Sequence, residues 1–508
     1  TEVANRASLH LQVNPAEDPT LLSAFIRYML TENLYDAQFC AEHVEDLEGL
    51  RALVEPFTPS YAATRCAISE DDLIKAAQMF GEAKRGVAVT GTGPNMSPRG
   101  ILTEHLICCL NTICGRVNKV GERVPNPGVL QTPRAREAEV IAADPAYGKG
   151  PWSRVRGLGE IIGEMPTAAL NDEILLEGEG QIKALICLGG NPVVAFPDQD
   201  KTVRAMKALD LLVCVDLYQS ATAKLADYIV APTLSLERDD VTMLTDTWYD
   251  QPYCHYTKAV LPRNPQSREE WEIYWELSHR SGLALELPGG LLDTQVRPTK
   301  FDVLELLTPN ASVPLSEIAT KGHGHIFSDV QVTVSEPEIK KEHRFQLLPA
   351  DISEQLQAVI GETYWQQPTN EDDGTVYSHL LISRRLKHVF NSSGQQLEGL
   401  RKKGTTNPAY IHPDDLAALK LSSGDLVEIE SAAGTLLGIV EAAEDIKPGV
   451  ISMAHAWGDL PDNGGEVRTQ GSSTNRLVDD DRTYNPITGM PRMSAIPVNL
   501  RAVAEAVA

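Results

Sequence analysis

Residues 183–192 read KALICLGGNP, an apolar run that stops at two glycines, an asparagine and a proline. The pattern soon returns: residues 211–215 read LLVCV and end at Asp216, and residues 228–232 read YIVAP. A helical segment around 201–209 separates the first two runs. Apolar runs without alternation are typical of parallel strands that are covered on both faces. Strand, turn and helix in this order predict a doubly wound α/β sheet.

A unit of the same kind is predicted upstream. Residues 19–34 place apolar side chains at helical spacing, and Ser69 caps a second helix that runs to Arg85. Residues 86–93 read GVAVTGTG, a short apolar run that ends in glycines, and a helical pattern returns at 100–114. The order of strand, glycine turn and helix predicts that this part of the chain is also α/β.

The pattern changes after about residue 370. Short strand-like runs now alternate with glycine-containing turns at a spacing of about 8–12 residues, which is typical of a β-barrel. A short helix is predicted at 413–419. Residues 286–370, with a helix at 353–360, are interpreted as a connecting region. The predicted barrel strands are 377–383, 426–430, 435–441, 450–454 and 494–500.

Composition excludes several classes of protein. The 508 residues are 42% hydrophobic and 23% charged, which is ordinary globular usage. The net charge of −25 repels nucleic acid and suits a partner with a basic face. No apolar run is long enough for a transmembrane segment. The chain begins TEVANRASLHLQV, without an initiator Met or a signal-like pattern, so we expect further chain upstream.

The cysteines and histidines give no metal site. The eight cysteines are scattered and form no C-x-x-C pair, which predicts reduced thiols in a cytoplasmic protein. Cys108, Cys109 and Cys114 lie on an apolar helical stretch, where core packing is favoured over an iron–sulfur site. His323 and His325 are interpreted as part of a surface loop. Because hydrolase, P-loop and zinc-protease motifs are also absent from the sequence, no catalytic residue and no metal ligand is assigned.

The strand ends carry residues suited to a ligand, because ligands of open α/β sheets lie outside the carboxyl ends of the strands. Backbone N–H groups in glycine turns, with a helix N-terminus behind them, suit a diphosphate. Neither turn is a complete G-x-G-x-x-G motif, and a plain tight turn is the alternative. Asp216 stands where Rossmann-type folds place the acid that binds a ribose hydroxyl, although it also suits an N-cap. The turn residues are Gly91, Gly93, Gly189, Gly190 and Asn191.

The predicted barrel supplies positive charge. Arg384 and Arg385 close its first strand, and His388, Asn391 and Ser392 follow. Such a density of donors suits phosphates or a polar heterocycle, and a solvated basic turn is the alternative. The loop residues Asn407 and Asn475 are, taken alone, turn formers.

In order and spacing these pieces resemble the C-terminal two-thirds of a molybdopterin oxidoreductase of the dimethyl sulfoxide reductase family. Residues 15–19 resemble the family's P-G-T-D turn, with Ala16 and Glu17 in place of Gly and Thr and with Asp18 as the implied guanine partner. Residues 188–192, 215–223 and 231–237 resemble three successive blocks of the family, and residues 384–385, 391–392, 407–415 and 475–489 resemble its dinucleotide-binding domain.

The resemblance implies two doubly wound dinucleotide-binding domains followed by a double-psi β-barrel. The implied boundaries are 1–135 for the rest of the first α/β domain, 136–285 for the second, 286–370 for the connecting region and 371–508 for the barrel. The cofactor-binding residues implied in addition to the turn residues are Asp18, Asp216, Tyr218, Ser220, Thr222, Glu237, Arg384, Arg385, His388, Asn391, Ser392, Asn407 and Asn475.

The resemblance also implies the chemistry. Two molybdopterin guanine dinucleotides would hold molybdenum or tungsten for a two-electron reaction on a small-molecule substrate. The 4Fe-4S cluster and the protein ligand to the metal would lie upstream, and a redox partner subunit or electron carrier would complete the system. An upstream twin-arginine signal would place the protein in the periplasm instead of the cytoplasm.

Substrate and rival functions stay open. Formate dehydrogenases of the family carry an Arg in a V-R-G-Q-N-N type motif, which is absent here, although Arg134 or Arg136 stands near that place. One rival function is a flavin or nicotinamide oxidoreductase, disfavoured by the incomplete glycine motifs. The other is a cofactor-free scaffold subunit of a redox complex. The presence of Asp216, Glu237, Arg385 and Asn475 argues against a scaffold, because folding alone requires none of them.

Overall fold

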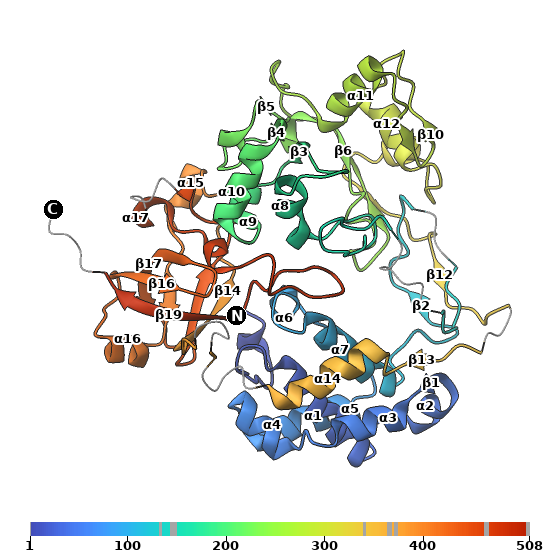
Figure 1. Cartoon of the computed structure of the whole chain (residues 1–508). Coiled ribbons are helices and arrows are strands. Elements are labelled where there is room, and N and C mark those ends of the chain that lie inside the picture. Colours follow the sequence, from blue (N-terminus) through green and yellow to red (C-terminus); the bar gives the residue numbers. More distant parts are fainter. Residues whose placement is uncertain are drawn as a thin grey trace.

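The computed structural model describes residues 2–131, 135–142, 150–338, 342–362, 368–369, 374–461 and 467–503. Figure 1 shows three parts: a helical lobe formed mainly by the first 115 residues, a sheet lobe in the middle of the chain with an extension beyond it, and a barrel near the C-terminus. The barrel lies beside both the helical lobe and the sheet lobe (Figure 1).

The helical lobe is built around α1 (Asp18–Thr31). Its buried side chains, among them Ile26 and Met29, pack with those of α7 (Gly100–Ile113) and of its other neighbours in one core. The predicted helices of this part are confirmed. The remaining elements are α2 (Ala37–His43), β1 (Val44–Glu45), α3 (Leu47–Val54), α4 (Pro59–Cys66), α5 (Glu70–Glu82), α6 (Thr92–Asn95), β13 (Phe345–Gln346) and α14 (Ala350–Gly361).

The strand expected within residues 86–93 is not formed, and this prediction is wrong. Val87 and Val89 are 68% and 76% exposed. A strand needs a hydrogen-bonded neighbour, and the amide of Asn111 takes that place instead. The N–H of Ala88 donates to Asn111 Oδ1 at 2.8 Å, and Asn111 Nδ2 donates back to the Ala88 carbonyl at 2.9 Å.

The sheet lobe contains the predicted parallel strands, β3 (Ala184–Leu188), β4 (Leu211–Val215) and β5 (Tyr228–Val230), in the order β3-β4-β5. Only one face of β3 is covered. Cys187 packs into a core with the helices, whereas Ile186 and Leu188 are 41% and 46% exposed. The expectation that both faces are covered is therefore wrong for the described chain. The helices are α8 (Thr167–Leu175), α9 (Pro192–Ala195) and α10 (Gln199–Ala208).

The predicted connecting region is divided between two parts of the molecule. Helix α14 matches the expected helix and packs Ile352, Leu356 and Val359 into the core of the helical lobe. The preceding residues extend the sheet lobe, where Trp275 of α11 packs with Leu292 and Val303. This extension comprises β2 (Arg123–Val124), β6 (Asp240–Val241), β7 (Tyr253–Cys254), β8 (Tyr256–Thr257), α11 (Glu270–Ser281), β9 (Glu286–Leu287), β10 (Gly290–Leu291), α12 (Lys300–Leu307), α13 (Leu315–Ile318), β11 (His325–Ile326) and β12 (Val332–Thr333).

The barrel is closed, in the strand order β14-β18-β15-β17-β16-β19. Alternate residues such as Val427 and Ile429 point into its core, as the predicted strand pattern requires. The predicted barrel is confirmed, and β15 is the strand that was not predicted. The elements are β14 (His379–Arg384), α15 (Glu398–Arg401), β15 (Ala409–Ile411), α16 (Pro413–Leu419), β16 (Leu426–Glu430), β17 (Thr435–Ala442), β18 (Val450–Ala454), α17 (Val467–Gln470) and β19 (Ile496–Ala502).

Candidate cofactor site at the junction of sheet lobe and barrel

Two parallel barrel strands end side by side at the junction. Strand β14 pairs with β18, and Arg384 lies opposite Ala454 at their carboxyl ends. The loops that follow these two strands carry most of the predicted barrel residues. The barrel therefore gathers these polar loops at one mouth, which faces the sheet lobe (Figure 1).

The cavity at this junction measures 430 Å³ and is lined by both the sheet lobe and the barrel. Asn191 and Ser220 reach it from the ends of the sheet strands, and Ser392 reaches it from the barrel. Three predicted residues from two separate parts of the chain thus share one cavity. Its other lining residues include Gln219, Lys224, Gln395, Gln396, Arg401, Thr405, Trp457, Asp459 and Gln470, none of which was predicted.

Several buried polar atoms around this mouth have no hydrogen-bond partner among the described residues. They are Arg384 Nη1, His388 Nε2, Trp457 Nε1 and Asn475 Oδ1. Buried polar groups in folded proteins are nearly always paired, so such a group of atoms indicates a missing polar partner. A guanidinium N–H, an indole N–H, an imidazole nitrogen whose role depends on its tautomer and an amide oxygen fit a ligand that is both anionic and rich in ring heteroatoms.

Ring contacts hold three of these groups in place. The guanidinium of Arg384 lies 4.0 Å from the ring centre of Tyr410, and the rings of His388 and Trp457 meet edge to face at 6.4 Å. Both contacts fix orientation without using the polar atoms, which stay available for a ligand.

A second polar network lies on the barrel side of the mouth. Asn391 Oδ1 accepts a hydrogen bond from Arg385 and lies 3.1 Å from His455 Nε2, and Ser383 Oγ lies 3.1 Å from His455 Nδ1. Burial, with the neighbouring charge of Arg385, lowers the pKa of His455. The imidazole is therefore neutral at pH 7, and the positive charge of this network sits on Arg385.

Two predicted residues have clear structural roles in the sheet lobe. Asn191 Oδ1 accepts from the Thr222 N–H at 3.1 Å and from Thr222 Oγ1 at 2.9 Å. Thr222 Oγ1 in turn accepts from the N–H of Val193 at 3.0 Å and is fully buried. These bonds tie the turn after β3 to the segment after β4, so Asn191 and Thr222 shape the cavity wall.

Asn407 is a clamp between barrel loops. Its Nδ2 donates to the carbonyls of Ala454 and Ser472 at 2.7 and 2.8 Å, and its Oδ1 accepts from the Ser472 N–H at 2.8 Å. Asn475 is fully buried and donates to the Phe196 carbonyl of the sheet lobe at 2.6 Å. The two asparagines therefore position the loops that form the cavity.

Gly471 gives a direct test of this clamp. Its φ is +72°, and a Cβ there would lie 2.2 Å from Asn407 Oδ1. We expect Gly471→Ala to lower stability by about 1–3 kcal/mol, from backbone strain and displacement of the clamp. Thermal unfolding of the purified variant measures this change. Gly361→Ala is the control, because its Cβ meets nothing within 4 Å; equal stability of both variants would contradict the clamp.

Other predicted residues lie outside the cavity wall. Asp216 Oδ1 accepts from the Tyr218 N–H at 3.4 Å, and Tyr218 is exposed. Glu237 Oε2 accepts from the Leu234 N–H at 3.1 Å, where it caps a short helix. The turn at Gly189 and Gly190 lies directly before Asn191, after the end of β3. The local bond of Asp216 agrees with its structural alternative, and the bond of Glu237 gives that residue a structural role that was not predicted.

The residues predicted upstream belong to the helical lobe and do not line the cavity. Asp18 begins α1, and burial raises the pKa of its carboxyl group. Gly91 and Gly93 lie in open surroundings, since a Cβ at either would meet nothing within 4 Å. The structure therefore does not bring these three residues together with the junction cavity.

The two arginines near the place of the formate dehydrogenase motif do not contribute to the described wall of the cavity. Arg134 lies outside the described residues, and Arg136 is exposed. The preceding loop is held by the buried Asp246, whose carboxylate accepts from the N–H groups of Val129 and Leu130 at 2.9 and 3.0 Å. Burial raises the pKa of Asp246 despite these bonds.

A buried ionic network joins the sheet lobe to the barrel. Asp480 is 1% exposed and accepts from Lys201 Nζ at 2.7 Å and from Asn171 Nδ2 at 2.9 Å. Arg156 lies 3.6 Å from the same carboxylate and also pairs with Asp172. The network fixes the segment after Asn475 against α8 and α10.

Among the described residues, no group of three or more His, Cys, Asp and Glu side chains is placed to hold a metal ion. No helix in the described ranges combines the length and the apolar character needed to span a membrane. All eight cysteines are free thiols; Cys109 is buried as expected for core packing, whereas Cys108 is exposed.

Known proteins resemble the chain along most of its length. The F420-dependent formate dehydrogenase subunit alpha of Methanocaldococcus jannaschii is 25% identical over 471 residues, which cover 89% of this chain and 66% of that protein. The trimethylamine-N-oxide reductase of Haemophilus influenzae is 24% identical over 88% of this chain and 59% of its own length. The chain thus spans less than two thirds of either relative.

A solved structure has the same fold. The acetylene hydratase from Pelobacter acetylenicus superposes with a TM-score of 0.74 at 19% identity, over 99% of this chain and 72% of its own.

Two family models match successive parts of the chain. The molydopterin dinucleotide binding domain matches residues 380–497, which contain the barrel and its mouth. The molybdopterin oxidoreductase model matches residues 1–280, more than half of the 508 residues. The chain belongs to the molybdopterin oxidoreductase family.

Proposed function

We propose that this chain forms most of the binding shell for two molybdopterin guanine dinucleotides in a molybdenum- or tungsten-dependent oxidoreductase. The junction cavity carries the proposal, because Asn191 and Ser220 from the sheet lobe and Ser392 from the barrel line it together. The unpaired polar atoms at the same mouth supply what a diphosphate and a purine-like ring require.

Each part of the cavity has a separate role in this proposal. Arg384 and Arg401 would hold the diphosphate, since Arg401 lines the cavity and Arg384, at the end of β14, has an unpaired N–H. Trp457 Nε1 and Asn475 Oδ1 would bind heteroatoms of the ring systems. Asn407 and Thr222 would keep the walls in position through the bonds described above.

The bound cofactor would supply a metal centre that exchanges two electrons with a small substrate. Arg384 and Arg385 would provide the positive charge at the mouth, whereas His455 is neutral. A negatively charged cofactor is thereby stabilised in a chain whose net charge is −25.

The fold supports the finer domain assignment. Parallel pairing of β14 with β18 and of β15 with β17 inside a closed barrel suits a double-psi β-barrel. The sheet lobe suits the second α/β domain. The doubly wound first domain, and the boundaries at residues 135, 285 and 370, stay predictions. Asp18, Gly91 and Gly93 are proposed to bind the second dinucleotide from the helical lobe.

Two relatives suggest candidate substrates, by their names a formate dehydrogenase and a trimethylamine-N-oxide reductase. The test is an anaerobic assay of the native enzyme with an artificial electron dye. Formate should reduce an oxidised dye, or the N-oxide should oxidise a reduced dye, after growth with molybdate or tungstate. Protein that contains no metal and turns over neither dye with any of these substrates would contradict the oxidoreductase function. That result would favour a scaffold function.

A further inference from the structure

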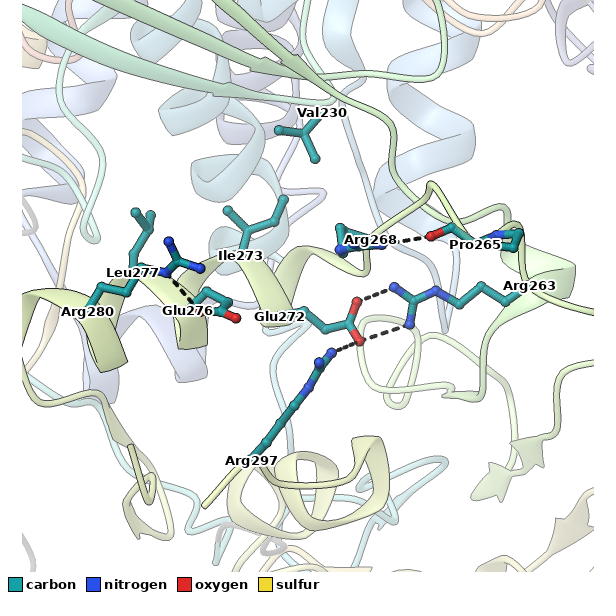
Figure 2. A pocket seen from close by; sticks show the side chains of 10 residues that line it. All are labelled: Val230, Arg263, Pro265, Arg268, Glu272, Ile273, Glu276, Leu277, Arg280 and Arg297. Atoms are coloured by element: carbon teal, nitrogen blue, oxygen red, sulfur yellow. Dashed lines mark hydrogen bonds and ion pairs between the residues drawn. The ribbon is translucent and has the colours of Figure 1, made fainter. Parts of the chain in front are cut away.

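A second cavity lies on the far side of the sheet lobe from the barrel. Its volume is 620 Å³, and it lies between the end of β5 and one face of α11 (Figure 2). It shares no lining residue with the junction cavity. The lining residues are Val230, Arg263, Pro265, Arg268, Glu272, Ile273, Glu276, Leu277, Arg280 and Arg297.

The charge of this cavity is opposite to that of the chain. Four arginines and two glutamates line it, a formal charge of +2 in a chain of net charge −25. Arginine is the residue best suited to bidentate recognition of phosphate. Such a concentration of guanidiniums on an acidic protein marks a place where an anion is attracted.

The buried carboxylate of Glu272 holds two arginines of the cavity in position. Figure 2 shows Arg263 and Arg297 both directed at Glu272. Arg263 Nη1 donates to Glu272 Oε1 at 2.8 Å. Burial of Glu272 is the largest single effect and opposes its ionisation, but the hydrogen bonds from Arg263 and the Glu269 N–H, together with the charges of Arg263 and Arg297, lower its pKa. One carboxylate thus orients two guanidiniums and neutralises only one of them.

The other two arginines are available to a ligand. Arg268 donates from Nη1 to the carbonyls of Pro265 and Ser267 at 3.0 and 2.8 Å, and it has no carboxylate partner among the described residues. Arg280 pairs with Glu276 one helical turn away, but the two side chains are 77% and 45% exposed. Exposed pairs of this kind contribute little free energy, so Arg280 is free to turn to an anion.

The rest of the lining is apolar. Ile273 and Leu277 lie on α11 beside the charged residues, and Val230 of β5 faces them (Figure 2). Leu277 is exposed although it is a large apolar side chain. Charged and apolar side chains that lie next to each other suit a ligand with phosphates and a flat ring. We propose that this cavity binds a nucleoside diphosphate, with the phosphates on Arg268 and Arg280 and the base on Ile273 and Leu277.

The experiment uses the native enzyme with its cofactor bound, so that the junction site is filled. Isothermal titration calorimetry with ADP and with inorganic pyrophosphate measures the affinity. The double variant Arg268→Ala/Arg280→Ala should weaken ADP binding by about tenfold or more, the loss expected for two charge-assisted contacts. Arg85→Ala is the control, because Arg85 is an exposed arginine of the helical lobe. Equal ADP affinity in the double variant and the control would overturn the proposal.

A second variant separates the phosphates from the base. Leu277→Ser should weaken ADP binding and leave pyrophosphate binding unchanged. If Leu277→Ser binds both ADP and pyrophosphate as tightly as the wild type does, the assignment of a nucleoside is overturned and the site recognises phosphate alone. Thermal unfolding of each variant checks that it is folded; the exposure of Arg268, Leu277 and Arg280 predicts no large change in stability.

Discussion

Replacing Asp480 with alanine is expected to destabilise the protein by about 3 kcal/mol, the low end of the cost of breaking a buried ion pair. The change removes a carboxylate that is 1% exposed and leaves Lys201 and Arg156 buried, with side chains 12% and 7% exposed. Asp172 still pairs with both cations, which is why the low end of the range applies. Calorimetric unfolding should show a lowered transition for the sheet lobe and barrel.

Asp481 provides the matched control. It adjoins Asp480 in the sequence, but its side chain is 57% exposed and lies 3.9 Å from Arg482. Asp481→Ala should leave the unfolding transition within about 0.5 kcal/mol of the wild type. If Asp480→Ala proves as stable as this control, the network does not hold the two parts together.

Replacing Arg384 with methionine is expected to weaken cofactor retention by about tenfold to a hundredfold, the value of one or two charge-assisted hydrogen bonds. Methionine keeps the apolar length of the side chain over Tyr410 but removes the guanidinium with its unpaired Nη1. Guanosine monophosphate released from the purified variant, per mole of protein, measures the loss.

Arg501→Met is the control for this variant. Arg501 lies in β19 of the same barrel and pairs with Glu430 on its exposed surface. The Arg501→Met variant should retain as much cofactor as the wild type. Equal retention in Arg384→Met and Arg501→Met would mean that the barrel mouth does not bind the diphosphate.

The sequence predicted well those helices and strands that are specified by their own residues and the turns beside them. Helix α16 and strands β16 and β18 have the predicted bounds, because flanking turns limit them and, in β16, apolar alternation marks the strand. The segment 86–93 has the same local signal as a strand, yet a strand depends on a partner elsewhere in the chain. In the described structure Asn111 replaces that partner, and no local pattern indicates this.

The candidate site was predicted only in part for the same reason. Asn191, Ser220 and Ser392 belong to recognisable motifs, and the structure places all three at the junction cavity. Trp457 and Arg401 lie in loops without a motif, and only the closure of the barrel brings them to the same mouth. The density of polar residues after β14 was the one signal in the sequence, and it pointed to the loop of Arg401 but not to that of Trp457.

The proposal that this chain encloses two molybdopterin guanine dinucleotides is tested most directly by the content of molybdenum, tungsten and guanosine monophosphate in the complete, anaerobically purified protein. We expect about two guanosine monophosphates for each molybdenum or tungsten atom, since the pterin cofactors hold the metal. Folded protein that contains neither metal nor guanosine monophosphate would contradict it.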